Sequence, residues 1–250
     1  MNSTRARLLQ LLPLLACCLG LRAEPAIIAK VRAHLGSEDV LNAVTSVHMV
    51  GTVTRDNPKD PAHPIISQVE MIVARPYKSR ITFTTGQNVE VDAVNGYDGW
   101  HRHEEADPAK WKQSVANVQA IRQLRANVWQ NLAFYRPYDS AGPEITDLGR
   151  VVLHGVACER VAFAHDPATV FYRYFDLSSG RLVATTTSSG SEIHEEGDLI
   201  SSGIRFPHSL VTTFPGARPL VVTLTFNQVT VNETFPDSIF SPPEPRPRKQ

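Results

Sequence analysis

Two histidine clusters are the most evident candidates for chemistry in this sequence. His101 and His103 are separated by one residue and are followed by two glutamates. Residues two apart on a strand project from the same face, so a metal ion could bind both imidazoles. The second cluster, His194-Glu195-Glu196, lacks the second histidine of the zinc-protease motif His-Glu-x-x-His. Because neither cluster has a further ligand at a recognisable spacing, we expect solvated strand ends and no metal site.

Nucleophilic catalysis and nucleotide binding find no support in the sequence. It contains no Gly-x-Ser-x-Gly, no Gly-x-Gly-x-x-Gly and no phosphate-binding loop. Cys158 has His154 nearby in the chain, but a lone cysteine on a strand is typically a small buried apolar residue. We therefore predict a protein that is not an enzyme, without catalytic residues and without a cofactor.

A group of apolar and aromatic residues is more coherent. They lie on elements that we place around one concavity, where a curved sheet with a helical lid can enclose a ligand. The same residues could equally form a filled core, and the sequence does not decide between the two. The candidate cavity lining consists of Trp100, Trp111, Val115, Val118, Ile121, Leu124, Phe206, Leu224 and Phe226.

Composition excludes one large class of partners. The chain has 250 residues, 42% of them apolar, which suits one domain with a single core. Of its 25 basic residues, three fall in the first 23 positions and no acidic residue does, so the remainder carries 22 basic against 25 acidic residues. A net charge of −3 provides no basic stripe for nucleic acid.

Residues 1–23 are typical of a secretory signal. Arg5 and Arg7 precede an apolar run from Leu8 to Leu21, and Ala23 offers a small residue for cleavage. That run is too short to cross a hydrocarbon core of about 30 Å as a helix. Leu14-Leu15-Ala16-Cys17 also resembles a bacterial lipobox. We expect a periplasmic protein, either cleaved after Ala23 with peripheral membrane contact only, or anchored to the outer membrane through lipidated Cys17.

Short strands separated by turn residues account for most of the remaining chain. In the first half they are centred on residues 47–53, 69–73, 81–83, 89–93 and 97–103, and a further pair covers 151–153 and 158–163. The second half contains Phe171–Leu177, Leu182–Thr187, Ile193–Leu199, Ile204–Phe214 and Leu220–Asn232. This order predicts an antiparallel sheet of nine or more strands drawn from both halves.

Two helical segments complete the prediction. Apolar spacing predicts a helix over Pro25–Leu35 that stops at Gly36, after which Ser37 caps a short second turn. Apolar residues every three or four positions predict a long amphipathic helix over Pro108–Tyr135, with Asp107 as its N-cap. The fold class is therefore α+β, with a strongly curved sheet covered by helices in one domain over residues 24–241. Residues 242–250 form a Pro-rich tail that we expect to be disordered.

With these elements in place, the chain resembles the outer-membrane lipoprotein-sorting family, the LolA/LolB-like carriers of the bacterial periplasm. The motifs occur in the family's order and span nearly the whole chain after the signal. They are Val44–Val53, Ala74–Ile81, Val94–Trp100, Tyr174–Asp176 with Gly180–Leu182, Gly203–Pro207, and Val229–Phe240.

The resemblance implies an open β-barrel, or strongly curved sheet, with helices over a hydrophobic cavity that holds acyl chains. No catalytic residue comes with it. It thus predicts an exported carrier of lipid or lipoprotein acyl chains, with outer-membrane lipoprotein sorting as the role that the resemblance suggests. The alternative is an envelope module on the same fold that binds proteins or senses stress, since one scaffold can serve several functions.

Overall fold

The computed structural model describes residues 24–57, 59–60, 62–107 and 110–244. The expected signal segment, including Cys17, lies outside the described residues, as do residues 245–250 of the expected tail. No helix among the described residues is long and apolar enough to span a lipid bilayer.

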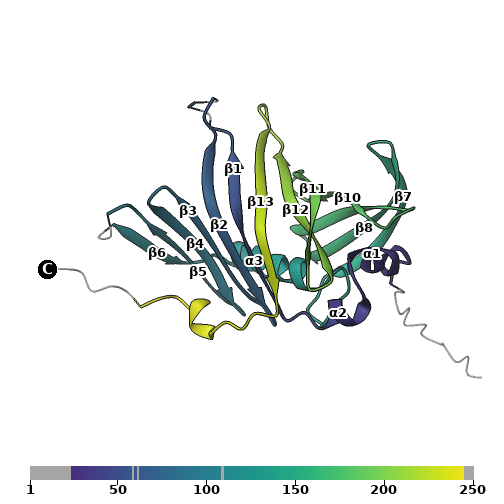
Figure 1. The fold of residues 1–250 in the computed structure, drawn as a ribbon, viewed down its shortest axis with the longest axis horizontal. Coiled ribbons are helices and arrows are strands. Elements are labelled where there is room, and N and C mark those ends of the chain that lie inside the picture. Colours follow the sequence, from purple (N-terminus) through teal and green to yellow (C-terminus); the bar gives the residue numbers. More distant parts are fainter. Residues whose placement is uncertain (1–23, 58, 61, 108–109, 245–250) are drawn as a thin grey trace, which may run out of the picture.

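Thirteen strands form one antiparallel sheet in the described part of the chain (Figure 1). The first half supplies β1 (Ser46–Arg55), β2 (Ile65–Ala74), β3 (Lys78–Thr85), β4 (Asn88–Asn95), β5 (Asp98–Glu104) and β6 (Trp111–Val115). The second half supplies β7 (Glu144–Leu153), β8 (Val156–Asp166), β9 (Thr169–Asp176), β10 (Leu182–Thr187), β11 (Glu192–Ser201), β12 (Ile204–Phe214) and β13 (Leu220–Val231). The prediction of a single sheet of nine or more strands from both halves is confirmed.

The chain order explains why a helix crosses this sheet. Each half is a meander, and the two meanders join where β1 pairs with β13, which leaves β6 and β7 as the two edges. The segment between β6 and β7 must therefore pass from one edge to the other. It contains α3 (Val118–Leu132), which contacts β1 to β5 and β9. The sheet curves around α3 without closing, as the α+β open-barrel prediction requires (Figure 1).

An irregularity where the two halves meet contributes to the curvature. Val50 and Gly51 of β1 pair with Gln228 and Phe226 of β13, so β13 carries one extra residue between them. Such a bulge bends a strand and increases its twist. A Cβ on Gly51 would lie 2.0 Å from the carbonyl oxygen of Thr225. Any side chain at position 51 would therefore push the two strands apart.

The long helix begins later than the sequence predicts. We expected it over Pro108–Tyr135, whereas α3 begins after Asn117, whose side chain accepts a hydrogen bond from the Ala120 amide at 2.9 Å. The segment Trp111–Val115 is the edge strand β6, paired with β5. Its apolar residues fit a period of two as well as a helical period. Pairing with β5 satisfies its backbone groups and decides the outcome.

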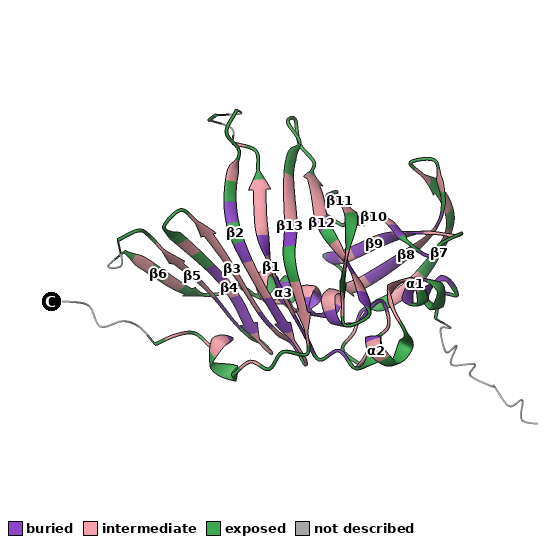
Figure 2. Ribbon diagram, viewed as in Figure 1, coloured by how far each residue is buried: buried purple, intermediate pink, exposed green. Residues whose placement is uncertain are grey.

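The apolar face of α3 packs into one part of the concave sheet. Leu124, Val128, Trp129 and Leu132 are buried, and the Trp129 ring centre lies 5.8 Å from that of Phe163. Buried residues gather in the strand halves beside α3, while the far halves are mostly half-buried or exposed (Figure 2). One helix therefore covers only part of the concave face.

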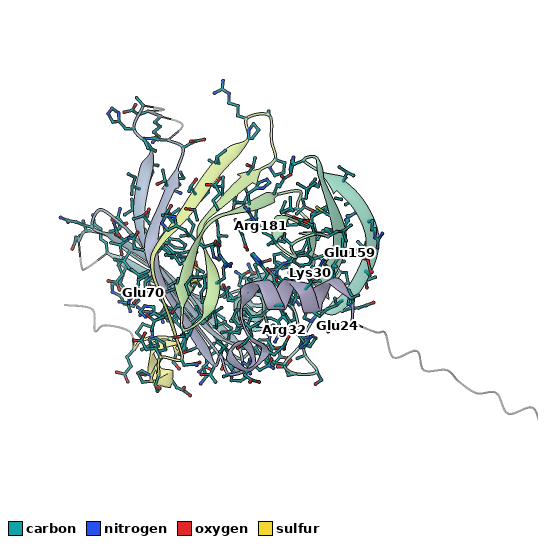
Figure 3. The ribbon with its side chains drawn as sticks, turned by 45° about the vertical axis from the view of Figure 1, so that its right-hand side comes forward. Glu24, Lys30, Arg32, Glu70, Glu159 and Arg181 are labelled. Carbon is teal, nitrogen blue, oxygen red and sulfur yellow. The ribbon has the colours of Figure 1, made fainter. Side chains whose placement is uncertain are left out.

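The N-terminal helices pack against one end of this assembly. α1 (Ile27–Leu35) is followed by Gly36, and the Ser37 side chain caps α2 (Glu38–Asn42) by accepting from the Val40 amide, as predicted. From α1, Lys30 donates to the Leu177 carbonyl oxygen at 2.7 Å, which fixes the helix beside the turn after β9 (Figure 3).

Arg32 ties α1 and α2 to the end of α3 and is only 1% exposed. Its guanidinium donates to both carboxylate oxygens of Glu38, each at 2.8 Å, and to Asn42 Oδ1 at 2.8 Å. Nη1 donates to the carbonyl oxygens of Ala133 and Phe134 at 3.2 and 2.9 Å. These carbonyls follow α3, so one buried cation of α1 satisfies acceptors from α2 and from the end of α3.

Replacing Arg32 should therefore destabilise the fold. We expect Arg32→Ala to lower the free energy of unfolding by about 3 kcal/mol, because it strands several acceptors at a buried site. Arg32→Lys should recover little, since an ammonium cannot reproduce the planar fork. Urea denaturation followed by circular dichroism measures both. Arg150→Ala is the control, because that side chain is 80% exposed; equal stability of Arg32→Ala and the control would contradict this account.

Candidate functional site

A cavity lies between α3 and the concave face of the sheet, and we call it the inner cavity. Its volume is about 270 Å³, close to the smaller ligand pockets, which begin near ~300 Å³. Its apolar lining comes from several strands and from the ends of α1 and α3. The lining residues of this kind are Leu35, Met49, Met71, Phe134, Phe171, Ile193, Phe206, Leu210 and Phe226.

A second hollow, the outer cavity, continues along the same face away from α3. Its volume is about 530 Å³, and Leu210 lines both cavities. Its apolar residues are Val53, Phe83, Leu210, Phe214, Leu220, Val222 and Leu224. Phe214 and Leu220 remain 41% and 38% exposed at the hairpin between β12 and β13. The two cavities therefore form one trough, buried at the α3 end and open to solvent at the hairpin end, and Arg55, Glu90 and His103 also line its outer part.

A buried cation stands at the inner end of the trough. Arg173 of β9 lines the inner cavity and is 8% exposed. Its guanidinium carbon lies 4.5 Å from the ring centre of Tyr135 and 5.3 Å from that of Phe163. Nη2 donates to Gln130 Oε1, while Nε has no hydrogen-bond acceptor among the described residues. A desolvated guanidinium with an unused donor favours an anionic group beside it.

The α3 surface that lines the inner cavity is polar. Asn127, Gln130 and Asn131 contribute to the lining, and Asn131 Nδ2 donates to the Asn127 carbonyl oxygen at 2.8 Å. Sequence analysis placed the apolar face of the helix over the cavity. That face is instead buried against the sheet, so the amide face borders the space that remains.

Gln130 fixes the protonation state of a neighbouring histidine. Its Oε1 accepts from Arg173, so its Nε2 donates to His165 Nε2 at 2.8 Å. His165 must accept at that nitrogen and is therefore neutral, with its proton on Nδ1. Burial, reinforced by the positive charge of Arg173, lowers the pKa of His165 from its usual 6.5 to about 4. The neutral ring keeps Gln130 oriented toward Arg173.

Glu195 of β11 supplies a carboxyl group to the same cavity. Burial raises the pKa of Glu195 above its ordinary value, and the positive charges of Arg173 and Arg181 offset part of that increase. Glu195 is therefore less readily ionised than a carboxyl group in water, whereas the Arg173 guanidinium keeps its charge. The inner end of the trough thus suits a group with net negative charge.

The structure brings three of the sequence-predicted lining residues into the trough. Phe206 and Phe226 line the inner cavity and Leu224 lines the outer one. Leu124 is buried in α3, and a Cβ added at Gly99 of β5 would lie 2.6 Å from Ile121 Cγ1. Ile121 and Leu124 therefore belong to the helix–sheet contact rather than to the lining of either cavity.

Four predicted lining residues lie elsewhere. Trp100 projects away from α3, because its neighbour Gly99 faces α3 and successive strand residues alternate. Trp111 and Val115 pair with Glu104 and Trp100 across β5 and β6, so they share the convex face with Trp100. Val115 is 85% exposed, and Val118, at the start of α3, is 65% exposed. Trp111 and Val115 were misplaced because the predicted helix over 111–115 is a strand, whereas Trp100 and Val118 lie on the predicted kind of element but on its side away from the trough.

The chain after β13 covers this convex face. It includes the short helix η1 (Asp237–Ile239), and the carbonyl oxygen of Phe240 accepts from Trp100 Nε1 at 2.8 Å. Gln113 Nε2 donates to the Pro243 carbonyl oxygen at 3.4 Å. Pro243, which we expected in a disordered tail, therefore contacts β6.

The histidine clusters do not converge on one site, although His103 lines the outer cavity together with Glu90. His101 and His103 share one face of β5, as predicted, but Nδ1 of each approaches a different carboxylate. His101 lies 2.9 Å from Asp92 and His103 lies 3.4 Å from Glu90. His194 is on β11, in the other half of the sheet. Cys158 is buried, and burial raises the pKa of its thiol, which disfavours the nucleophilic thiolate.

Solved structures share this architecture. A LolA superfamily protein from Nitrosomonas europaea has a TM-score of 0.54 at 11% identity, over 85% of this chain and 97% of that chain. A DUF1329 family protein from Desulfovibrio piger has a TM-score of 0.54 at 6% identity, over 86% and 96%. A domain assigned to the outer-membrane lipoprotein-sorting proteins of Vibrio parahaemolyticus has a TM-score of 0.53 at 7% identity, over 86% and 94%. The chain has a LolA-like fold.

This finding confirms the resemblance drawn from the sequence motifs, at the level of the fold. The sequence matches no family profile and no curated protein. The structural similarity identifies the fold as LolA-like. The polar inner end of the trough follows from the residues of this chain and not from the comparison.

Sequence reasoning missed Arg173 and Gln130. A signal for Arg173 was present, because it lies between Phe171 and Phe175 on the apolar face of a predicted strand. A charged residue in that position marks either a buried polar contact or a ligand site. Gln130 carried no such signal, since its partners come from β8 and β9.

The His165 environment predicts a pH dependence of stability. Its pKa is about 4 in the folded chain and near ~6.5 when unfolded. Below pH 6.5 the unfolded chain binds more protons, so stability should fall as the pH drops toward 4. Between pH 7 and pH 5 we expect His165 to contribute about 1 kcal/mol of loss, after allowance for its partial exposure.

Urea unfolding of wild type and His165→Gln at both pH values measures this contribution. Glutamine keeps an acceptor near Gln130 but does not titrate, so the variant should lose less stability than wild type. Other titrating groups contribute equally to both proteins. An identical loss in the two proteins would contradict the assignment of a depressed pKa to His165.

Proposed function

We propose that this chain is an exported, non-enzymatic carrier that binds the acyl chains of lipids or lipoproteins in the trough. The observation that carries the proposal is the continuous apolar surface from the inner cavity to the exposed residues Phe214 and Leu220. Each methylene transferred from water to such a surface contributes about 0.8 kcal/mol. A long chain can therefore bind without specific polar contacts along its length.

The polar inner end gives the bound molecule a direction. Arg173 offers a positive charge and an unused donor, and the α3 amides offer further hydrogen bonds. We place the negatively charged end of the ligand here, with its hydrocarbon extending past Leu210 into the outer cavity. Among the described residues that line the inner cavity, Glu195 is the only acidic one. A carboxylate or phosphate on the ligand would add a negative charge beside Arg173.

The rest of the proposal concerns location. The arginines and apolar run of residues 1–23 support export to the periplasm, where LolA-like scaffolds suit transfer of acylated molecules between membranes. Participation in outer-membrane lipoprotein sorting is the specific role we propose. Mass spectrometry of the intact protein, purified without detergent from the periplasm of its own host, should detect a bound lipid or acylated peptide.

A charge in the middle of the trough should prevent lipid uptake. Leu210 lines both cavities and is half-buried, so Leu210→Asp places a carboxylate beside the acyl chain while the fold survives. We expect at least a tenfold loss of affinity for a dansyl-labelled fatty acid, because an unpaired charge in apolar surroundings is costly. Displacement of the probe by palmitate measures specificity.

Val118→Asp is the matched control, because Val118 is 65% exposed and lines neither cavity. It should bind the probe as wild type does. If folded wild type takes up no lipid, or if Leu210→Asp binds as well as Val118→Asp, the carrier proposal fails. A protein-binding envelope module would then be the better interpretation.

Arg173 should determine the preference for a negatively charged end. Arg173→Met keeps the unbranched apolar part of the side chain but removes the guanidinium, so palmitate should bind about tenfold more weakly. Hexadecanol, which has the same chain without the charge, should bind equally to both proteins. Arg160→Met is the control, because Arg160 also stacks on tyrosines, Tyr172 and Tyr174, but faces away from the trough. Equal losses for palmitate and hexadecanol would assign Arg173 a purely structural role.

A further inference from the structure

A cluster of three metal-ligating side chains lies outside the trough. His154, Glu192 and His194 each offer one ligand atom, and these atoms lie within 4.8 Å of one another. Glu192 Oε1 is 2.9 Å from His154 Nε2 and 2.5 Å from His194 Nε2. Among the described residues, these are the three side chains whose ligand atoms lie close enough together to hold one metal ion. Sequence analysis considered His194 and His154 separately and expected no metal site.

The cluster is on the opposite face of the sheet from the proposed lipid site. Ile193 and Glu195 of β11 line the inner cavity, so Glu192 and His194 project from the other side of that strand. His154 belongs to the turn between β7 and β8, where its φ of 49° is in the left-handed region. The turn brings its side chain to β11. Ligands at the cluster therefore need not compete with an acyl chain.

The hydrogen bonds around His194 orient its ring toward Glu192. Nδ1 of His194 lies 3.3 Å from the carbonyl oxygen of Val183, which can only accept, so Nδ1 carries a proton. Nε2 is therefore the nitrogen that faces Glu192 Oε1, at 2.5 Å, and a cation, either a proton or a metal ion, must lie between these two atoms. A carbonyl that fixes the histidine tautomer in this way is the usual outer partner of a metal-binding imidazole.

We propose that His154, Glu192 and His194 bind a divalent transition-metal ion of the zinc type. Two imidazoles and one carboxylate suit such an ion, whereas calcium and magnesium prefer oxygen ligands alone. Three protein ligands leave a fourth position for water.

Only small side-chain movements are needed to admit the ion. Zinc ligands in a tetrahedron lie about 3.3 Å apart, from bond lengths near ~2.1 Å. The carboxylate oxygen and the two Nε2 atoms are therefore slightly too close in the present arrangement. All three side chains are at least 32% exposed, so they are free to separate by the required amount.

Metal binding would join distant parts of the sheet. His154 is at the end of the hairpin that contains the edge strand β7, and the other two ligands are on β11, with β8, β9 and β10 between them. A bound ion would therefore fasten the edge hairpin to the body of the sheet. Because the folded chain assembles the three ligands and the unfolded chain does not, the ion should stabilise the fold.

The test uses the full secreted chain, free of any affinity tag, with zinc chloride as the probe at fixed pH. We expect elemental analysis after dialysis to find one zinc per chain, and thermal unfolding to shift upward with zinc but not with calcium chloride. Glu192→Gln and His194→Gln should each weaken zinc binding at least tenfold in calorimetric titration. His154→Asn should do the same, and asparagine is chosen because it tolerates the left-handed turn.

His101→Gln is the matched control, because His101 also pairs with a carboxylate on a strand but belongs to no group of three converging ligand atoms among the described residues. It should bind zinc as wild type does. Circular dichroism establishes that each variant is folded, and dansyl fatty-acid binding should be unchanged in all of them, which separates this site from the trough. Wild type without bound zinc, or zinc retained by both Glu192→Gln and His194→Gln, would overturn the proposal.

Discussion

The coverage of one wide sheet by one short helix is the constraint on which this structure depends. Strands spaced at about 4.8 Å make a sheet of thirteen roughly 60 Å wide along its curve. The 15 residues of α3 reach about 22 Å. Curvature brings more strands within reach of the helix, yet no helix among the described residues covers the strand ends beyond it. The apolar trough is this uncovered part of the concave face.

The same constraint explains the chemistry of the trough. The apolar side of α3, with Trp129 and Leu132, is buried against the sheet. The side of α3 that lines the cavity therefore carries amide side chains, and one of them, Gln130, accepts a hydrogen bond from Arg173. The buried end therefore combines a cation with amide groups, while the outer cavity combines hydrocarbon side chains with Arg55, Glu90 and His103. A desolvated cation at the buried end suits an amphiphile whose charged end enters first.

Strand alternation separates two different environments within a few ångströms on β11. Glu195 faces the trough, where burial raises its pKa, while Glu192 faces away, where hydrogen bonds from His154 and His194 lower its pKa. The LolA-like scaffold thus has room for a site on its outer face that is independent of the cavity. A metal ion at such a site would stabilise the edge of the sheet and would not contact a molecule bound in the trough.

The sequence by itself determined the elements whose signals are local. Alternation and turn residues predicted the strands, and Gly36 with Ser37 predicted the break between α1 and α2, because these depend on neighbours in the chain. Spacing could not place Trp111 and Val115, since their pattern fits both a helix and an edge strand. Pairing with β5 decided it and turned both residues, with Trp100, to the convex face. Likewise, the partners of Arg173 and the meeting of His154 with Glu192 depend on sheet register and curvature, which join residues far apart in the chain and are fixed only when the whole sheet is assembled.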